Sequence, residues 1–132
     1  MNEEQLAGIA NDMRIDIVRM IAEAGSGHPG GSLSCADILS VLYFDTMKHD
    51  PSNPKNEDRD RFILAKGHAA PALYAALAES GYFPKEELAT LRKLGTRLQG
   101  HPDMNLLPGI EVSTGSLGQG LSIACGMACG MK

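Results

Sequence analysis

Residues 61–79 read RFILAKGHAAPALYAALAE, and this stretch decides the fold class. Its apolar run at residues 62–65 is short and lies between charge and glycine, which is typical of a strand buried on both faces of a parallel sheet. A tight turn at Gly67 and a helix rich in alanine and leucine over residues 69–79 follow directly. This order places the turn at the carboxyl end of a sheet, where α/β proteins bind ligands. The stretch predicts an α/β fold, mostly helical, with one clear parallel-type strand.

Four more helices are expected around this stretch. Apolar side chains recur at steps of three and four over residues 6–24, which predicts an amphipathic helix that ends at a glycine-rich run. Ser34 and Asp37 have the spacing of a capping box and predict that a second helix begins there. A proline followed by acidic residues predicts a helix over residues 84–93. The last segment, residues 117–131, is small or apolar almost all round and predicts a buried helix.

These elements do not complete a fold by themselves. One strand cannot build a parallel sheet, and a helix that is apolar on all sides needs other elements to cover it. We therefore expect residues 1–132 to be the first part of a larger domain, either as a truncated product or as one piece of a split protein.

The composition excludes several classes of protein. With 43% hydrophobic residues, 21% charged residues and a net charge of −4, the chain is typical of a soluble globular protein without a basic surface for nucleic acid. The longest stretch without charge, residues 112–131, is rich in glycine, serine and threonine, so no membrane span is expected. The acidic N-terminus does not resemble a secretory signal, and we expect a cytoplasmic protein. Three cysteines match no disulfide or zinc pattern and are expected to be buried: Cys35, Cys125 and Cys129.

Three of the four histidines follow a glycine in an expected loop, namely His28, His68 and His101. Glycine lets the backbone approach a ligand closely, and an imidazole titrates near neutrality, so each pair suits proton transfer at a ligand. Because each pair lies at the end of a different element, we expect the three side chains to converge on one cleft. His49 lies at an expected helix end and is predicted to be a solvated cation there.

A glycine-rich loop at residues 115–120 precedes the last expected helix. Backbone amides at that helix N-terminus can face an anion or a polar ring. The alternative is a turn followed by close packing of the helix, and the loop alone does not separate the two.

Four motifs together resemble the transketolase family. They are GSGHPG at residues 25–30, LAKGHA at 64–69, GHP at 100–102 and STGSLGQG at 113–120, in the order and approximate spacing of transketolases. The resemblance spans nearly the whole chain. Ser116 stands where many full-length transketolases have proline, which is similar to the separately encoded N-terminal subunits of split transketolases.

The resemblance implies an incomplete thiamine-diphosphate-binding fold. It also implies a transferase that moves two-carbon ketol units between sugar phosphates in the pentose phosphate pathway of carbohydrate metabolism. The implied cofactors are thiamine diphosphate and magnesium. The implied partners are a C-terminal transketolase subunit, or the missing remainder, and further copies in a homo-oligomer, with neither nucleic acid nor membrane. Without those partners we expect the chain to be inactive.

The resemblance assigns roles residue by residue. His28 and His101 look like the catalytic pair that touches sugar oxygens near the reacting carbon. His68 looks like the residue that reaches the cofactor diphosphate beside the substrate channel. It is assigned both to cofactor binding and to catalysis. The loop that supports the cofactor's aminopyrimidine corresponds to Gly115, Ser116 and Leu117.

Other interpretations stay open. The family's magnesium ligands, a Gly-Asp-Gly motif and a later asparagine, have no counterpart here, so no metal ligand is assigned and Asp103 is no substitute. 1-Deoxyxylulose-5-phosphate synthase shares the cofactor, although the motifs favour transketolase. A non-catalytic remnant or assembly module of the same fold is a second alternative. A third, a metallohydrolase, would need His28, His68 and His101 to share one metal ion.

Overall fold

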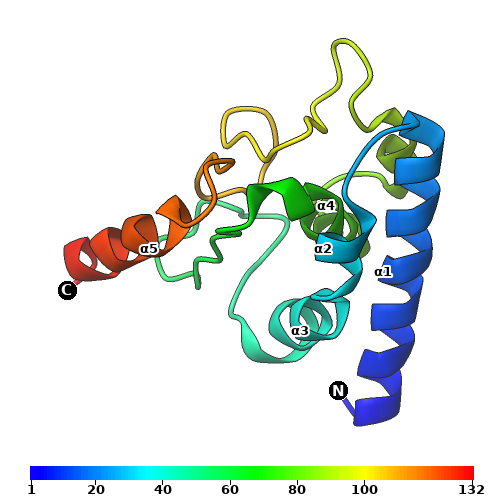
Figure 1. The fold of residues 1–132 in the computed structure, drawn as a ribbon. Coiled ribbons are helices and arrows are strands. Elements are labelled where there is room, and N and C mark those ends of the chain that lie inside the picture. Colours follow the sequence, from blue (N-terminus) through cyan, green and yellow to red (C-terminus); the bar gives the residue numbers. More distant parts are fainter.

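The computed structural model describes all 132 residues, and every regular element in it is helical. In chain order the elements are α1 (Glu3–Ala24), α2 (Pro29–Leu33), α3 (Ala36–Val41), the π-helical turn η1 (Leu42–Thr46), the 3-10 turn η2 (Gly67–Ala69), α4 (Ala70–Glu79), the 3-10 helix η3 (Lys85–Thr90) and α5 (Gln119–Gly130). Helices α1 to α4 pack together, while α5 extends away from them (Figure 1). Long irregular segments connect η1 to η2 and η3 to α5.

The expected strand at residues 62–65 is not present, and the prediction of an α/β fold with one parallel-type strand is wrong for this chain. A strand exists only where a neighbour completes its ladder of backbone hydrogen bonds, and no segment of the chain pairs with these residues. Their side chains pack instead. Leu64 is buried, and the ring centroid of Phe62 lies 5.8 Å from that of Tyr43, edge to face. The apolar run therefore reflects burial of side chains rather than a sheet.

Local signals explain both ends of α1. Asn2 caps the helix through a capping box, in which its side chain accepts from the amide of Gln5 at 2.8 Å and the Gln5 side chain accepts from the Asn2 amide at 3.1 Å. Gly25 ends the helix in the left-handed conformation, with φ at 65°. The predicted amphipathic helix is confirmed, and its apolar side, including Met13 and Ile17, is buried.

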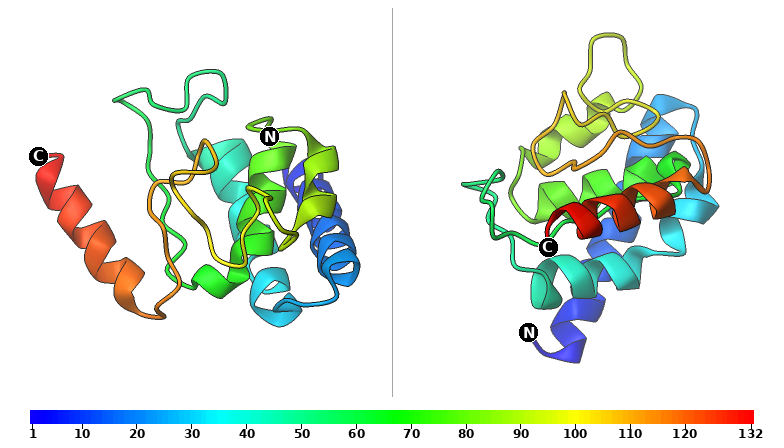
Figure 2. Two further views of the ribbon diagram at one scale, coloured as in Figure 1. Left: turned by 90° about the horizontal axis from the view of Figure 1, so that it is seen from above. Right: turned by 90° about the vertical axis from the view of Figure 1, so that its left-hand side faces the viewer.

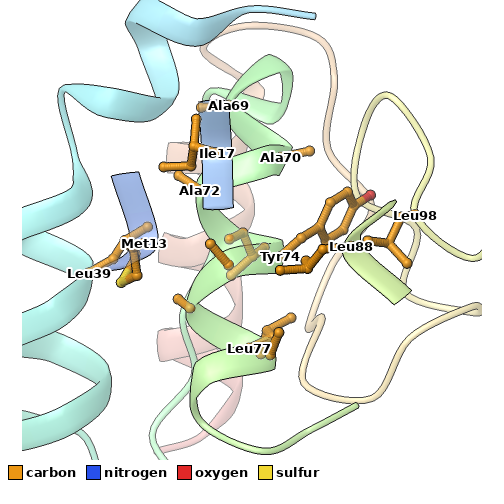
Figure 3. Close-up of a cluster of buried hydrophobic side chains, with 14 of the residues drawn as sticks. Met13, Ile17, Leu39, Ala69, Ala70, Ala72, Tyr74, Leu77, Leu88 and Leu98 are labelled. Carbon is orange, nitrogen blue, oxygen red and sulfur yellow. The ribbon is translucent and has the colours of Figure 1, made fainter. Parts of the chain in front are cut away.

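Helix α4 lies at the centre of the core. Every residue from 70 to 78 is buried, which confirms the helix predicted at this place. Side chains of α1 and α3 pack on one side of α4, and Leu88 and Leu98 lie on the other side beside Tyr74 (Figure 3). Because α4 is enclosed along its length, the η2 turn at its N-terminus starts from a rigid support.

The region between α1 and η1 differs from the expected loop and capping box. Pro29 opens the short helix α2, since proline at the first helical position loses no intrahelical hydrogen bond. Cys35, rather than Ser34, is the N-cap of α3, and no side chain caps it. The Ser34 hydroxyl donates to the Gly31 carbonyl at 3.2 Å, and Asp37 pairs with an arginine of α1. Contacts with neighbouring segments therefore override the local pattern.

Two other expected helices differ in form or surroundings. Residues 84–93 form only the 3-10 helix η3. Helix α5 is present, but the prediction that it is buried is wrong, because Gly120 is its one buried residue and Leu121 is 69% exposed. It projects from the packed helices (Figure 2). None of the helices in the chain combines the length with the apolar character that a membrane span requires. Cys125 and Cys129 on α5 are exposed, so burial is confirmed for Cys35 alone.

The side chain of His49 is partly buried and bound within the protein, rather than solvated as its position predicts. Its Nε2 lies 2.6 Å from the carbonyl oxygen of Tyr43, and its Nδ1 lies 3.0 Å from the hydroxyl of Tyr82. Because a carbonyl can only accept, Nε2 of His49 donates to Tyr43, while Nδ1 forms its hydrogen bond with the Tyr82 hydroxyl. His49 therefore joins the end of η1 to the segment after α4.

One carboxylate, that of Asp16 on α1, is buried at the edge of the core. The residue is 6% exposed, and its Oδ2 lies 2.9 Å from the ammonium of Lys85, which also pairs with Glu79. Burial raises the pKa of Asp16 and outweighs the opposing effect of Lys85. The negative charge on Asp16 therefore opposes folding.

Asp16→Asn is expected to flatten the pH dependence of stability. With a folded-state pKa above the unfolded value of 3.8, the folded protein keeps a proton that the unfolded chain has lost. The contribution of Asp16 to the free energy of unfolding of the wild type should therefore fall as pH rises from about 3 to 7, and the variant lacks this fall. Urea unfolding across this range measures both slopes, with Asp12→Asn as an exposed control on the same helix. A variant less stable than the wild type at neutral pH would show that the Lys85 pair outweighs burial.

Candidate functional site

His28 and His68 lie against each other. His28 is the N-cap of α2 and His68 lies in η2, with ring centroids 5.4 Å apart and planes inclined by 69°. Gly31 lies beside the His68 ring, since a methyl group built on Gly31 would be 3.0 Å from Nε2 of His68. Two of the three predicted histidines therefore meet, and the lack of a side chain at Gly31 makes room for one of them.

Lys66 joins the segments that carry these two histidines. Its ammonium donates to the carbonyl of Gly31 at 2.6 Å and to the hydroxyl of Ser34 at 3.1 Å. Because Lys66 lies directly before η2, while Gly31 is within α2, this cation fixes α2 over the turn that bears His68.

Gly67 brings the η2 turn into contact with the glycine-rich loop. A methyl group on Gly67 would lie 2.6 Å from the carbonyl carbon of Thr114 and 2.7 Å from the amide nitrogen of Gly115. Both are backbone atoms that cannot swing aside, so only glycine allows this approach. The Thr114 amide also donates to the carbonyl of Pro102 at 3.3 Å, which joins the loop to the segment after His101.

The ring of His101 lies against the glycine-rich loop. A methyl group on Gly115 would be 3.5 Å from Cγ and Cδ2 of the His101 ring. The backbone here is held by Tyr74 of α4, whose hydroxyl donates to the carbonyls of Gln99 at 2.8 Å and His101 at 3.3 Å. Burial raises the pKa of Tyr74, so its hydroxyl stays protonated and can donate. His68 and His101 thus adjoin the contact of Gly67 with Gly115, and His28 lies against His68, while the roles of all three remain predictions.

Arg92 belongs to this region, although sequence reasoning missed it. Its φ is 60°, in the left-handed region that a residue with a side chain rarely adopts. Its guanidinium lies against Gly100, where a methyl group would be 3.2 Å from Cζ, and its Nη1 lies 3.5 Å from the hydroxyl of Ser26. Arg92 therefore spans the segments that precede His28 and His101. No sequence motif includes it, and only its backbone conformation distinguishes it.

The loop before α5 divides into an exposed part and a packed part. Gly115, Ser116 and Leu117 are exposed and open to a ligand. Gly120 is buried, because a methyl group there would lie 2.5 Å from Cα of Ala65. Close helix packing, the alternative explanation of the glycine pattern, is thus correct for Gly120, whereas residues 115–117 take no part in it.

The chain shows no metal centre among its own side chains. No group of three or more histidine, cysteine, aspartate or glutamate side chains is placed to hold an ion, as a metallohydrolase would need. Asp103 is engaged locally, with Oδ1 accepting from the amide of Asn105 at 2.9 Å. A cavity of about 660 Å³ opens between α1 and η3, and no histidine lines it, so the motif residues and not this cavity define the candidate site.

The fold is shared with solved transketolases. The chain superposes on a Campylobacter jejuni transketolase with a TM-score of 0.91 and 44% identity, over 97% of this chain and 20% of that one. It superposes on a Pichia stipitis transketolase, in complex with sedoheptulose-7-phosphate, with a TM-score of 0.88 and 39% identity, over 92% and 18%. The structural class is therefore that of the N-terminal part of these enzymes.

Sequence comparison gives the family. Residues 6–132 match the sequence model described as "Transketolase, thiamine diphosphate binding domain", so the chain belongs to the transketolase family. It is 52% identical over 134 residues to the 6-deoxy-6-sulfo-D-fructose transketolase subunit SqwG of Clostridium sp. (strain MSTE9), covering all of this chain and 49% of that subunit. It is 49% identical over 125 residues to a transketolase of Pongo abelii, covering 95% and 20%. The predicted family is confirmed, and the chain spans half or less of these relatives.

Gly67→Ala is expected to separate the η2 turn from the glycine-rich loop. The added methyl group meets backbone atoms at 2.6 and 2.7 Å, so the free energy of unfolding should fall by about 1–3 kcal/mol. Urea unfolding measures the change. Gly8→Ala is the matched control, because nothing lies within 4 Å of its new methyl group, and it should stabilise α1 by about 0.5–1 kcal/mol. Unchanged stability of Gly67→Ala would mean that turn and loop do not touch in solution.

Proposed function

We propose that the chain forms part of the diphosphate-binding domain of a transketolase that transfers two-carbon ketol units between sugar phosphates. The observation that carries this proposal is the meeting of His28 with His68, beside a loop that also touches His101. Their loops come from widely separated parts of the sequence, and packing of a core does not require exposed imidazoles to gather there. SqwG, described as a transketolase subunit, supports a partner chain, and we propose that catalysis takes place in an oligomer that includes it.

The residues present fit thiamine diphosphate in part. When bound, this cofactor supplies the carbanion that attacks the ketose carbonyl. His68 would meet the diphosphate, and Gly115, Ser116 and Leu117 would support the aminopyrimidine. The contact of Gly67 with Thr114 and Gly115 supports this assignment, because it brings the turn that bears His68 next to the exposed residues 115–117. Magnesium ligands would come from outside residues 1–132, since no group of three or more histidine, cysteine, aspartate or glutamate side chains gathers within them.

The histidines would act on the sugar. An imidazole can donate a hydrogen bond to a developing oxyanion and can move the hydroxyl proton as a carbon–carbon bond breaks. His28 and His101 are exposed, as groups that meet a substrate must be, while the partly buried His68 is held between His28 and Gly31. Because of the family resemblance, we also propose that the enzyme is cytoplasmic and acts in the pentose phosphate pathway.

A second candidate is a non-catalytic assembly module. The observation that favours it is the exposed apolar surface of α5, where Leu121 and Ile123 are 69% and 37% exposed. Such a surface indicates association with another protein segment. A chain that self-associates but never supports ketol transfer, even with the rest of a transketolase, would favour this candidate.

His101→Asn tests the proposal directly. In a transketolase assembled from this chain, the remaining residues and its partner, kcat/KM for a ketose phosphate donor should fall by roughly 10²–10⁴-fold. The KM for thiamine diphosphate should change little, because this imidazole is assigned to the sugar. His49→Gln is the control, since His49 binds Tyr43 and Tyr82 instead and should alter stability but not kcat/KM of folded enzyme. Wild-type kcat/KM in His101→Asn would remove this assignment.

A further inference from the structure

Arg59 and Glu111 form a two-pronged ion pair. Nε of Arg59 donates to Oε1 of Glu111 at 2.8 Å, and Nη2 donates to Oε2 at 2.7 Å. The third nitrogen, Nη1, donates to the carbonyl of Asn56 at 2.8 Å. Both side chains are largely buried, at 17% and 11% exposed, so water does not replace these bonds easily. The hydrogen bonds that Arg59 donates to Glu111 raise the pKa of Arg59.

The pair joins the two irregular segments that enter the candidate site. Arg59 lies eight residues before Gly67, and Glu111 lies four residues before Gly115. No backbone hydrogen bond joins residues 59–67 to residues 111–118. In the absence of a ladder, the relative position of these segments depends on the ion pair at one end and, at the other, on the contact of Gly67 with Gly115 and the packing of Gly120 against Ala65.

Each member of the pair has its own support. Beside Arg59, the Asp60 amide donates to the Lys48 carbonyl at 2.8 Å, and the Lys48 amide donates to Oδ2 of Asp60 at 2.8 Å. Before Glu111, Gly109 adopts φ 84° and packs so closely that a methyl group would lie 2.6 Å from Cδ2 of Leu77. The ion pair therefore connects two anchored points of the chain.

We propose that Arg59 and Glu111 are positioning residues, which hold residues 111–117 alongside the segment that leads to Gly67 and so set the place of the loop Gly115–Leu117. The consequence for the cofactor rests on the proposed function above. The effect on the loop itself does not, because it concerns contacts within this chain. Neither residue belongs to a motif of the sequence, and neither touches the histidines.

The alternative is that the pair contributes only to overall stability. The chain offers a matched comparison in Arg97 and Glu87, which form the same two-pronged pair at 2.9 and 2.7 Å between η3 and the segment after it. That pair does not touch residues 111–117. If both pairs act only on stability, removal of either carboxylate should affect the glycine-rich loop equally.

Amide hydrogen exchange in the 132-residue chain, followed by NMR, distinguishes these cases without any cofactor. The reporter is the Thr114 amide, which donates to Pro102, and the reference is the Leu77 amide in the last turn of the buried helix α4. In Glu111→Gln, exchange at Thr114 should rise by about tenfold or more while Leu77 changes far less. In Glu87→Gln, exchange at Thr114 should stay within about threefold of wild type.

Arg59→Lys keeps the charge and removes one prong, so it is the variant to use if Glu111→Gln does not fold, and its rise at Thr114 should be smaller. Equal rises at Thr114 and Leu77, or equal behaviour of Glu111→Gln and Glu87→Gln, would overturn the proposal. In the assembled enzyme, Glu111→Gln should raise the KM for thiamine diphosphate with little change in kcat at saturation. A faster exchange of the Thr114 amide without that change in KM would reject the cofactor assignment of the loop and leave the positioning role of the ion pair intact.

Discussion

The close approach of Gly67 to Thr114 and Gly115 is the constraint on which the rest of the site depends. The added volume of one methyl group would bring carbon within 2.6 Å of a backbone atom, so the contact requires glycine and fixes the distance between two loops. His68 follows Gly67 directly, and the ring of His101 lies against Gly115. This backbone contact therefore limits the separation between His68 and His101. His28 joins these two residues through its edge contact with His68.

Helix α4 supports the η2 turn and so stabilises the contact of Gly67 with the glycine-rich loop. Its residues are buried from 70 to 78, so the η2 turn at its start has little freedom to move (Figure 3). The hydroxyl of Tyr74, on the same helix, donates to the carbonyl of His101. Lys66, directly before η2, donates to the carbonyl of Gly31 in α2. The loops of the site are irregular, yet each is held by a donor or a glycine that comes from a packed element.

Much of this arrangement could be predicted, and the failures have physical reasons. Helix α1 follows from periodicity and helices α4 and α5 from their content of small and apolar residues, and the Gly-His pairs mark the loops, because these signals are local in the sequence. The strand at residues 62–65 failed because a ladder needs a neighbour that this chain does not provide. Arg92 and the Arg59–Glu111 pair were missed because their partners lie far away in sequence, where neither spacing nor composition reveals a contact.

The contact of Gly67 with the glycine-rich loop can be observed directly in solution. Nuclear Overhauser spectra of the labelled 132-residue chain should show a cross-peak between the α-protons of Gly67 and the amide proton of Gly115, and another between the rings of His28 and His68. Both arise only if the turn and the loops are packed as described. A folded chain that shows the contacts of α1 with α4 but neither of these cross-peaks would contradict the account.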